Sequence, residues 1–240
     1  MTVFDEMRWH WPSDFADLHQ RFRSATPFPH IVLDNIFPPQ VVSSLYDEIP
    51  QASDEAWIRW GGGKPETCNV KFKKRGLSDV ARMPEPIRRM FATLTCDRFV
   101  TELSALTGTG DLVIDPSFSG GGVHCSGQGA ALRVHADPIR HPDPGAYDQA
   151  INLILYINPN WEEHFGGELE LWSRDCQQCE TSIAPLFNRL IVFQTDRTTF
   201  HGHPRPNLCP PDQYRASLAV YYYVKRDKIV DIVNNRPIWR

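Results

Sequence analysis

The sequence has little that would place it in a membrane or on a nucleic acid. No stretch approaches the ~18 consecutive apolar residues of a membrane-spanning helix, and the N-terminal residues contain no apolar signal core. Basic residues are not clustered, and 25 Lys and Arg residues stand against 29 Asp and Glu residues, for a net charge of −4. This balance excludes the basic surface that binds nucleic acids or anionic membranes. We therefore expect a cytoplasmic monomer or homodimer with no nucleic-acid or membrane partner.

The sequence also lacks the cysteine pattern of a disulfide framework or a structural zinc site. Its six cysteines are scattered, and no secretory signal accompanies them, so free thiols are expected. Cys176 and Cys179 form a lone C-x-x-C pair without two further ligands at matching spacing. We interpret this pair as part of a solvated loop, and its role stays open.

No internal repeat or linker divides the 240 residues, which suffice for a single domain with a sizeable core. In the first 110 residues, apolar side chains recur at helical spacing. Helices are predicted over Asp14–Arg23, over 38–49, where prolines stand near the first turn, and over 84–107, where Gly108 closes the run. A strand is expected at 27–34.

From residue 111 to residue 224 the pattern changes to short strands with a period of two. Gly, Pro, Asn and Asp turns separate them, which is typical of an all-β sandwich or barrel. The tail, 225–240, is charged but ends with Ile238 and Trp239, so it either packs back on the body or contacts a partner. Residues 51–76, rich in glycine and mixed charge, predict a loop or a weak hairpin.

One pattern in the β region carries metal-binding chemistry. His135 and Asp137 are two residues apart, so on a strand both side chains point to the same face. A second imidazole, from His201 or His203, could complete a set of two histidines and one carboxylate. That set is the site type of non-haem Fe(II) oxygenases. His-x-Asp alone is a weak signal, because it arises often by chance.

A candidate anion-binding pair follows further along the chain. Arg215 begins an apolar, aromatic strand, and Ser217 shares its face. A guanidinium offers a planar fork to a carboxylate, and an unpaired charge on such a strand would be costly. Asn152 and Tyr156 share the polar face of an otherwise apolar strand, which suits a ligand-filled interior. For Asn152, cross-strand hydrogen bonding is the alternative.

Six segments in a fixed order extend these observations over roughly residues 27–224. They are Gly120–His124, Gly127–Asp137, Ile151–Asn158 with Trp161, Gly166–Trp172, Phe200–Pro204 and Arg215–Ser217. In this order they resemble the Fe(II)/2-oxoglutarate-dependent dioxygenase superfamily, in particular its prolyl-4-hydroxylase-like branch.

The resemblance implies a mainly β fold with bracing helices, built on a double-stranded β-helix, or jelly-roll, core of cupin-like form. One domain would span 1–240. It would consist of helical N-terminal support over about 1–110, the jelly-roll core over about 111–224 and the C-terminal tail over 225–240.

The resemblance also implies cofactors and their ligands. Fe(II) would be held by His135, Asp137 and His201, with His203 as the competing third ligand, and O2 would be consumed. The cosubstrate 2-oxoglutarate would be bound by Arg215, Ser217 and Asn152.

Weaker candidates line the expected substrate pocket. Arg133 would meet an anionic group of the substrate or pair with Glu168 or Glu170, and His203 would line the entrance. The whole set is Arg133, His124, Gln128, Tyr156, Trp172 and His203. In relatives of this type the region of residues 51–76 covers the substrate; a solvated connector is the alternative.

The expected activity is hydroxylation of an unactivated C–H bond of a small molecule, with release of succinate and CO2. The substrate would be an amino acid or a biosynthetic intermediate, free or carrier-bound. A carboxylate at Asp137 favours hydroxylation over halogenation, while desaturation and cyclisation stay open. Two alternatives remain, a peptidyl-prolyl hydroxylase and a catalytically silent cupin-like binding module.

Overall fold

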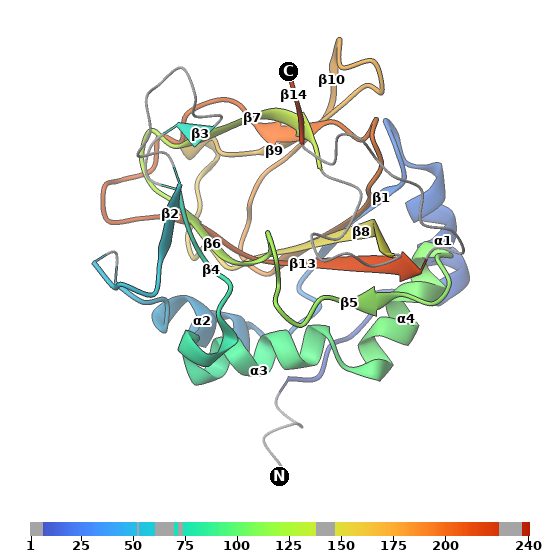
Figure 1. Ribbon diagram of the computed structural model, residues 1–240, viewed down its shortest axis with the longest axis horizontal. Helices are drawn as coiled ribbons and strands as arrows, with labels where there is room; N and C mark the ends of the chain where they lie inside the picture. Colours follow the sequence, from blue (N-terminus) through green and yellow to red (C-terminus); the bar gives the residue numbers. More distant parts are fainter. Residues whose placement is uncertain (1–6, 52, 61–69, 72–73, 138–146, 226–236) are drawn as a thin grey trace.

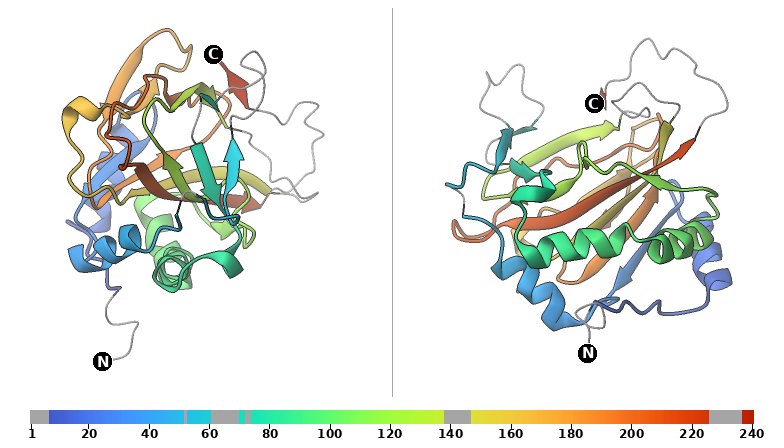
Figure 2. Two further views of the ribbon diagram at one scale, coloured as in Figure 1. Left: turned by 90° about the vertical axis from the view of Figure 1, so that its left-hand side faces the viewer. Right: turned by 60° about the horizontal axis from the view of Figure 1, so that its bottom comes forward.

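The computed structural model describes residues 7–51, 53–60, 70–71, 74–137, 147–225 and 237–240. Two antiparallel sheets face each other, and helices cover the outer side of the larger one (Figures 1 and 2). This arrangement confirms the predicted jelly-roll core with bracing helices.

The larger sheet runs in the order β1 (His30–Asp34), β11 (Arg189–Gln194), β8 (Tyr147–Tyr156), β13 (Arg215–Lys225), β6 (Gly122–Ser126), β4 (Lys74–Leu77) and β2 (Ile58–Trp60), with β5 (Val113–Ile114) beside β13. The smaller sheet runs in the order β10 (Cys179–Ile183), β9 (Leu169–Trp172), β12 (His201–His203), β7 (Ala131–Ala136) and β14 (Ile238–Trp239), with β3 (Val70–Lys71) also paired to β7.

The helices lie close to their predicted positions. They are α1 (Phe15–Ser24), α2 (Pro39–Asp47), α3 (Glu85–Leu94) and α4 (Asp97–Thr107), with 3-10 turns η2 (Val80–Arg82) and η3 (Glu163–Phe165). The predicted helical stretch 84–107 is two helices, because Cys96 adopts an extended backbone with φ −70° and ψ 152°. At the end of α3 the Phe91 carbonyl accepts two hydrogen bonds from Thr95, one from its backbone N–H at 3.1 Å and one from its hydroxyl at 2.8 Å.

The predicted stop of α4 is correct. Gly108 has φ +69°, and a Cβ at this position would lie 2.4 Å from the His19 ring. Glycine is therefore required both by the backbone conformation and by the packing of α1 against α4.

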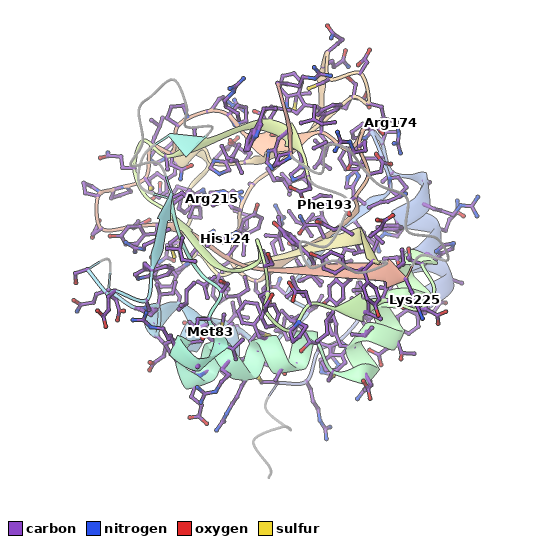
Figure 3. The ribbon with its side chains drawn as sticks, in the orientation of Figure 1. Met83, His124, Arg174, Phe193, Arg215 and Lys225 are labelled. Carbon is purple, nitrogen blue, oxygen red and sulfur yellow. The ribbon has the colours of Figure 1, made fainter. Side chains whose placement is uncertain are left out.

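The strands of the larger sheet have two different faces. On β8, Leu153 and Leu155 pack into the core that α1 to α4 cover, while Asn152 and Ile154 face the space between the sheets. Tyr222 of β13 joins the helical side, where its hydroxyl donates to the Leu94 carbonyl at 2.7 Å. Figure 3 shows His124 and Arg215 between the sheets and Met83 on the helical side.

One outer strand of each sheet comes from a region whose structure the sequence left open. In the C-terminal tail, β14 pairs with β7, so residues 237–240 pack back on the body. Residues 226–236 lie outside the described ranges. Within 51–76, β2 and β4 form an antiparallel pair, but β3, which lies between them in sequence, pairs with β7 of the smaller sheet. Residues 61–69 and 72–73 are also outside the described ranges.

The structure also describes the cysteines and the length of the helices. Each of the five cysteines in the described ranges is a free thiol, including Cys176 and Cys179. Among the same residues, every helix is too short or too polar to span a bilayer.

Candidate active site

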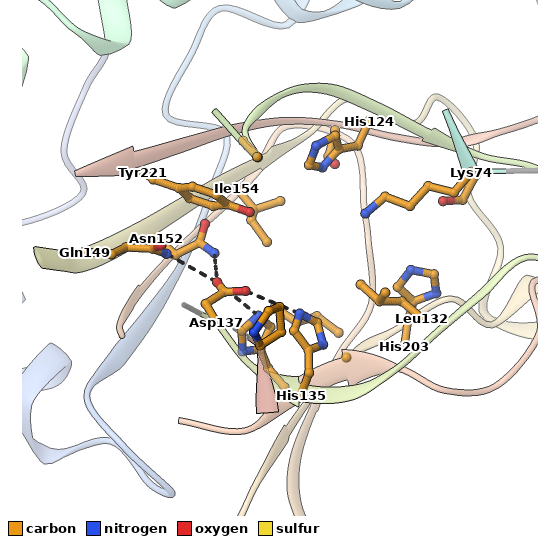
Figure 4. Close-up of a pocket in the computed structure, with 18 of the residues that line it drawn as sticks. Lys74, His124, Leu132, His135, Asp137, Gln149, Asn152, Ile154, His203 and Tyr221 are labelled. Atoms are coloured by element: carbon orange, nitrogen blue, oxygen red, sulfur yellow. Dashed lines mark hydrogen bonds and ion pairs between the residues drawn. The ribbon is translucent and has the colours of Figure 1, made fainter. Parts of the chain in front are cut away.

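Three potential metal ligands meet at the inner side of the smaller sheet. His135 lies on β7, Asp137 directly follows that strand, and His201 begins β12 opposite His135. His135 Nε2 is 3.4 Å from Asp137 Oδ1, and His201 Nε2 is 3.7 Å from Asp137 Oδ2. One ligand atom from each residue lies within 4.8 Å of the others, and all three side chains are buried (Figure 4). This donor set fits a divalent metal such as ferrous iron, with positions left for other ligands.

Both histidines are oriented by their own strands. The Nδ1 atom of His135 is 2.8 Å from the Arg133 carbonyl, and Nδ1 of His201 is 3.0 Å from the Thr199 carbonyl. Because a carbonyl only accepts, each Nδ1 carries the proton and donates it. The lone pair of each imidazole is therefore on Nε2, the atom that faces Asp137, as a metal ligand requires.

The carboxylate of Asp137 is held by two amides from β8. Gln149 Nε2 donates to Asp137 Oδ2 at 3.2 Å, and Asn152 Nδ2 donates to the same oxygen at 3.4 Å. Burial alone would raise the pKa of Asp137, but His201, His135 and the Gln149 hydrogen bond outweigh burial and hold it well below its usual range. Burial lowers the pKa of His201 to about 4, against the attraction of Asp137. An ionised carboxylate and a neutral imidazole are the forms that bind a metal.

Strands β12 and β7 approach each other closely at this centre. A Cβ on Gly202 would lie 2.9 Å from the carbonyl oxygens of Arg133 and Leu132, so only glycine fits between the histidines of β12. His201 pairs with His135, but His203 pairs with Leu132, so β7 has one extra residue in this interval. This β-bulge separates His203 from the other candidate ligands, so the geometry favours His201 over His203 as the third ligand.

A buried cation lies in the same cavity. The Arg215 guanidinium donates from Nε to the Gly167 carbonyl and from Nη2 to the Tyr156 hydroxyl, both at 2.6 Å. It also lies over the Tyr156 ring at 4.8 Å. None of the ion pairs in the described part of the chain involves Arg215. Neutral partners thus fix the position of a buried charge, and a carboxylate ligand would compensate it.

The cavity that joins these groups has a volume of about 460 Å³, within the range of small-ligand sites. Of the predicted residues, it is lined by His124, His135, Asp137, Asn152, His201, His203, Arg215 and Ser217. Tyr156 lies behind the wall as the partner of Arg215. Asn152 lines the cavity but bonds Asp137, which adds a role as support for the metal ligand.

Arg133 was predicted to face the substrate or to pair with Glu168 or Glu170, and both interpretations are wrong. Because the bulge reverses the alternation along β7, Leu132 lines the cavity and Arg133 is exposed. Arg133 donates from Nε and Nη2 to the backbone oxygen of Arg240, at 3.2 and 3.0 Å. Glu170 pairs instead with Arg205, at 3.0 Å.

Two further predicted pocket residues lie elsewhere. Gln128 is exposed in the turn between β6 and β7. Trp172 points away from the cavity, because Leu169 and Leu171 occupy the inner face of β9. Trp172 packs beside Val134 on the other side of the smaller sheet.

Several cavity residues were not predicted, notably Lys74, Gln149, Tyr221 and Trp239. Gln149 and Tyr221 belong to predicted strands, and a bulge between β8 and β13 complicates their alternation. Lys74 and Trp239 lie on very short strands, which have no detectable period. Trp239 stacks on the His135 ring with centroids 4.7 Å apart, an arrangement set by the pairing of β14 with β7.

Comparison with known proteins agrees with this geometry. Residues 121–223 match the model of the 2OG-Fe(II) oxygenase superfamily, a range that contains all three candidate metal ligands and Arg215. A curated relative, Prolyl 3-hydroxylase OGFOD1 of Mus musculus, is 23% identical over 180 residues. That match covers 73% of this chain but only 29% of the mouse protein.

Solved structures show the same fold. A prolyl-4-hydroxylase from Pseudomonas putida has a TM-score of 0.51 at 17% identity, covering 90% of this chain and 100% of the other. A Trichoplax adhaerens prolyl hydroxylase, solved with a hypoxia inducible factor oxygen degradation domain peptide fragment, has a TM-score of 0.56 at 18% identity, covering 87% and 90%. At these identities the likeness concerns the fold.

Proposed function

The chain belongs to the 2OG-Fe(II) oxygenase superfamily, and from that premise we propose that it hydroxylates an unactivated C–H bond of a small molecule, an amino acid or a biosynthetic intermediate. We include in the proposal one catalytic domain over 1–240, with its chemistry in the jelly-roll core. As a 2-oxoglutarate-dependent dioxygenase the enzyme uses Fe(II), 2-oxoglutarate and O2.

Each part of the proposed site has a defined task. His135, Asp137 and His201 would hold Fe(II) through two Nε2 atoms and a carboxylate oxygen. Arg215 would bind the distal carboxylate of 2-oxoglutarate, and Ser217, two residues along the same strand, would donate a further hydrogen bond. When bound, iron with 2-oxoglutarate and O2 supplies the oxidising chemistry that hydroxylates the substrate and releases succinate and CO2.

The residues around these ligands restrict what can happen in the cavity. Gln149 and Asn152 hold the Asp137 carboxylate by one oxygen, so its orientation toward the metal is set before a ligand enters. Two sheets and β14 surround the centre, which limits the access of water and orients the substrate C–H bond. The single observation that carries the proposal is that a metal triad and a buried arginine share one small cavity.

The size of this cavity supports a small substrate. About 460 Å³ must hold 2-oxoglutarate together with the reacting part of the substrate. Pro237 and Trp239, from the chain end that pairs with β7, form part of its wall. A peptide chain would have to pass this wall, whereas a free amino acid would fit behind it.

Peptidyl-prolyl hydroxylation is the second candidate. It is supported by the likeness to the mouse protein named a prolyl 3-hydroxylase and by the fold match to a prolyl hydroxylase solved with a peptide. We place this activity second because Pro237 and Trp239 form part of the cavity wall, which a peptide chain would have to pass.

The test is succinate formation by the Fe(II)-loaded protein with 2-oxoglutarate and O2. One set of reactions contains free amino acids and biosynthetic acids, and a second contains short proline-containing peptides. We expect a free small molecule to stimulate succinate release and to gain one oxygen atom by mass spectrometry, with no product when a chelator is present. Stimulation by proline peptides alone would replace our proposal with the second candidate.

A further inference from the structure

A second cation faces the cavity from the edge of the larger sheet. Lys74 begins β4 and is in register with Ser126 of β6, and Ser126 is in register with Arg215 of β13. The three residues therefore form one row across three neighbouring strands, and all three line the cavity. Strands pair at 4.7–4.9 Å, so the backbones of Lys74 and Arg215 are about 10 Å apart.

The side chain of Lys74 extends into the middle of the cavity. Figure 4 shows its amine pointing into the open space between His124, which comes from β6, and His203, which comes from the opposite sheet. Burial, with the repulsion of Arg215, lowers the pKa of Lys74 to about 8, so at pH 7 the amine is still mainly protonated.

Two imidazoles, those of His124 and His203, lie near this amine, and the carboxylate of Asp137 lines the same cavity. His203 is buried, and its Nδ1 has no hydrogen-bond partner in the described part of the chain. An imidazole with an open nitrogen near an ammonium group is suited to a ligand that carries an anionic group and a further polar atom.

The positions of the two cations suggest different ligands. Arg215 is fixed by Gly167 and Tyr156 and has Ser217 on the same strand, which together provide for one carboxylate. Lys74 is two strands away and enters across β6. The cavity therefore offers a second anion position, next to the space in which the substrate must lie.

We propose that Lys74 binds a carboxylate group of the substrate, with His203 as a neighbouring hydrogen-bonding group, so that the enzyme selects small carboxylic acids over neutral analogues. The inference rests on the proposed function, since it concerns the substrate of the same site. It distinguishes a free amino acid, which has a carboxylate, from a residue within a peptide, which does not.

The test compares carboxylic acids with their amides. Free L-amino acids and the matching C-terminal amides are titrated into the full-length protein loaded with Zn(II) and 2-oxoglutarate, and dissociation constants are measured by calorimetry. The variants are Lys74→Met, Lys74→Arg and, as a matched control, Lys225→Met, which removes an exposed lysine from the far end of β13. We expect at least one acid to bind the wild type roughly tenfold or more tightly than its amide.

The variants separate the possible causes. We expect Lys74→Met to weaken acid binding by roughly tenfold to a hundredfold and to remove the preference over the amide, while Lys74→Arg keeps much of it and Lys225→Met leaves it intact. The affinity for 2-oxoglutarate alone should change less than about threefold in Lys74→Met.

Two results would overturn the inference. One is the absence of any acid-over-amide preference in the wild type or its persistence in Lys74→Met. The other is a large loss of 2-oxoglutarate affinity, which would assign Lys74 to the cosubstrate. Substrate-independent succinate formation by the Fe(II)-loaded wild type is measured in parallel. If it persists, the oxygenase function stands even when the substrate inference fails.

Discussion

At the scale of single residues, the site depends on charge states that burial alone would not produce. Asp137 remains a carboxylate in a buried position because two imidazoles and an amide surround it. Arg215 carries the permanent charge of a guanidinium, and neutral oxygens accept its hydrogen bonds in this buried position. Each residue is therefore poised for a ligand that supplies the missing charge, a metal for Asp137 and a carboxylate for Arg215.

Replacing Asp137 by alanine tests the metal centre. The variant keeps both imidazoles but loses the only charged ligand, so we expect Mn(II) or Co(II) binding to weaken by roughly a hundredfold and succinate formation to be abolished. Metal affinity is measured by calorimetry. Asp212→Ala, which removes an exposed carboxylate, is the control and should behave as wild type. Full activity in the Asp137→Ala variant would rule out the ligand assignment.

Replacing Arg215 tests the cosubstrate position. In Arg215→Ala the carboxylate of 2-oxoglutarate would lose a bidentate partner, and we expect the KM for 2-oxoglutarate to rise roughly tenfold to a thousandfold. Arg215→Lys should have an intermediate effect, because it keeps the charge but not the fork. An unchanged 2-oxoglutarate requirement in Arg215→Ala, equal to that of the exposed-residue control Arg23→Ala, would show that another group anchors the cosubstrate.

At the scale of elements, the sequence predicts what depends on local periodicity. The helices α1 to α4, the glycine stop at Gly108 and the two-faced strand β8 all follow from apolar spacing. The break between α3 and α4 was not predicted, although it falls between two apolar runs of the stretch 84–107, because it depends on the extended backbone of one residue, Cys96.

The sequence predicts much less where a bulge or a very short strand decides which side chains face the cavity. His135 and Asp137 were found because they lie within one regular interval. Arg133 was misplaced because the bulge in β7 reverses the alternation only two residues away. Lys74 and Trp239 were missed because short strands acquire their position from long-range pairing, which carries no local signal.

The short strand β14 contributes to the metal centre through one aromatic contact. Trp239 stacks on His135 at an interplanar angle of 27°, and Arg240 N donates to the Val134 carbonyl at 2.9 Å. Because such ring pairs are worth about 0.5–1.5 kcal/mol, we expect Trp239→Ala to weaken Co(II) binding by roughly twofold to tenfold. The visible absorption of bound Co(II) reports both affinity and ligand geometry.

Trp239→Phe keeps a ring against His135 and serves as the matched control, so its Co(II) affinity should lie near that of wild type. Equal affinity and an identical Co(II) spectrum in Trp239→Ala would mean that β14 covers the cavity without orienting the ligand.

At the scale of the whole molecule, the cavity is a product of the two-sheet architecture. The residues that line it come from strands that are distant in sequence. These strands include β4 and β6 near one edge of the larger sheet, β13 near its centre, and β7, β12 and β14 in the smaller sheet. The helices cover the outer side of the larger sheet with apolar side chains. The polar residues of this sheet that line the cavity therefore lie on its inner side. One consequence is that several histidines are buried in neutral form.

These buried histidines make the stability of the metal-free protein depend on pH. Burial lowers the pKa of His30 from 6.5, and it holds the pKa values of His124 and His203 well below 6.5. In the unfolded chain these side chains gain protons as the pH falls through about 6.5, whereas in the folded protein they gain them only at lower pH. The unfolded state then binds more protons, so stability decreases toward lower pH, by up to about 1.4 kcal/mol per pH unit for each group.

We therefore expect the free energy of unfolding in chelator to be nearly constant from pH 8 to pH 7 and to fall steadily from pH 6.5 to pH 5, as measured by urea denaturation. His203→Gln should reduce the slope of this fall, since it removes one of the titrating groups, whatever it does to stability at pH 7.5. His164→Gln, which changes an exposed histidine, should leave the slope unaltered. A stability that is flat down to pH 5, or an equal slope in the His203→Gln and His164→Gln variants, would show that burial does not keep these imidazoles neutral.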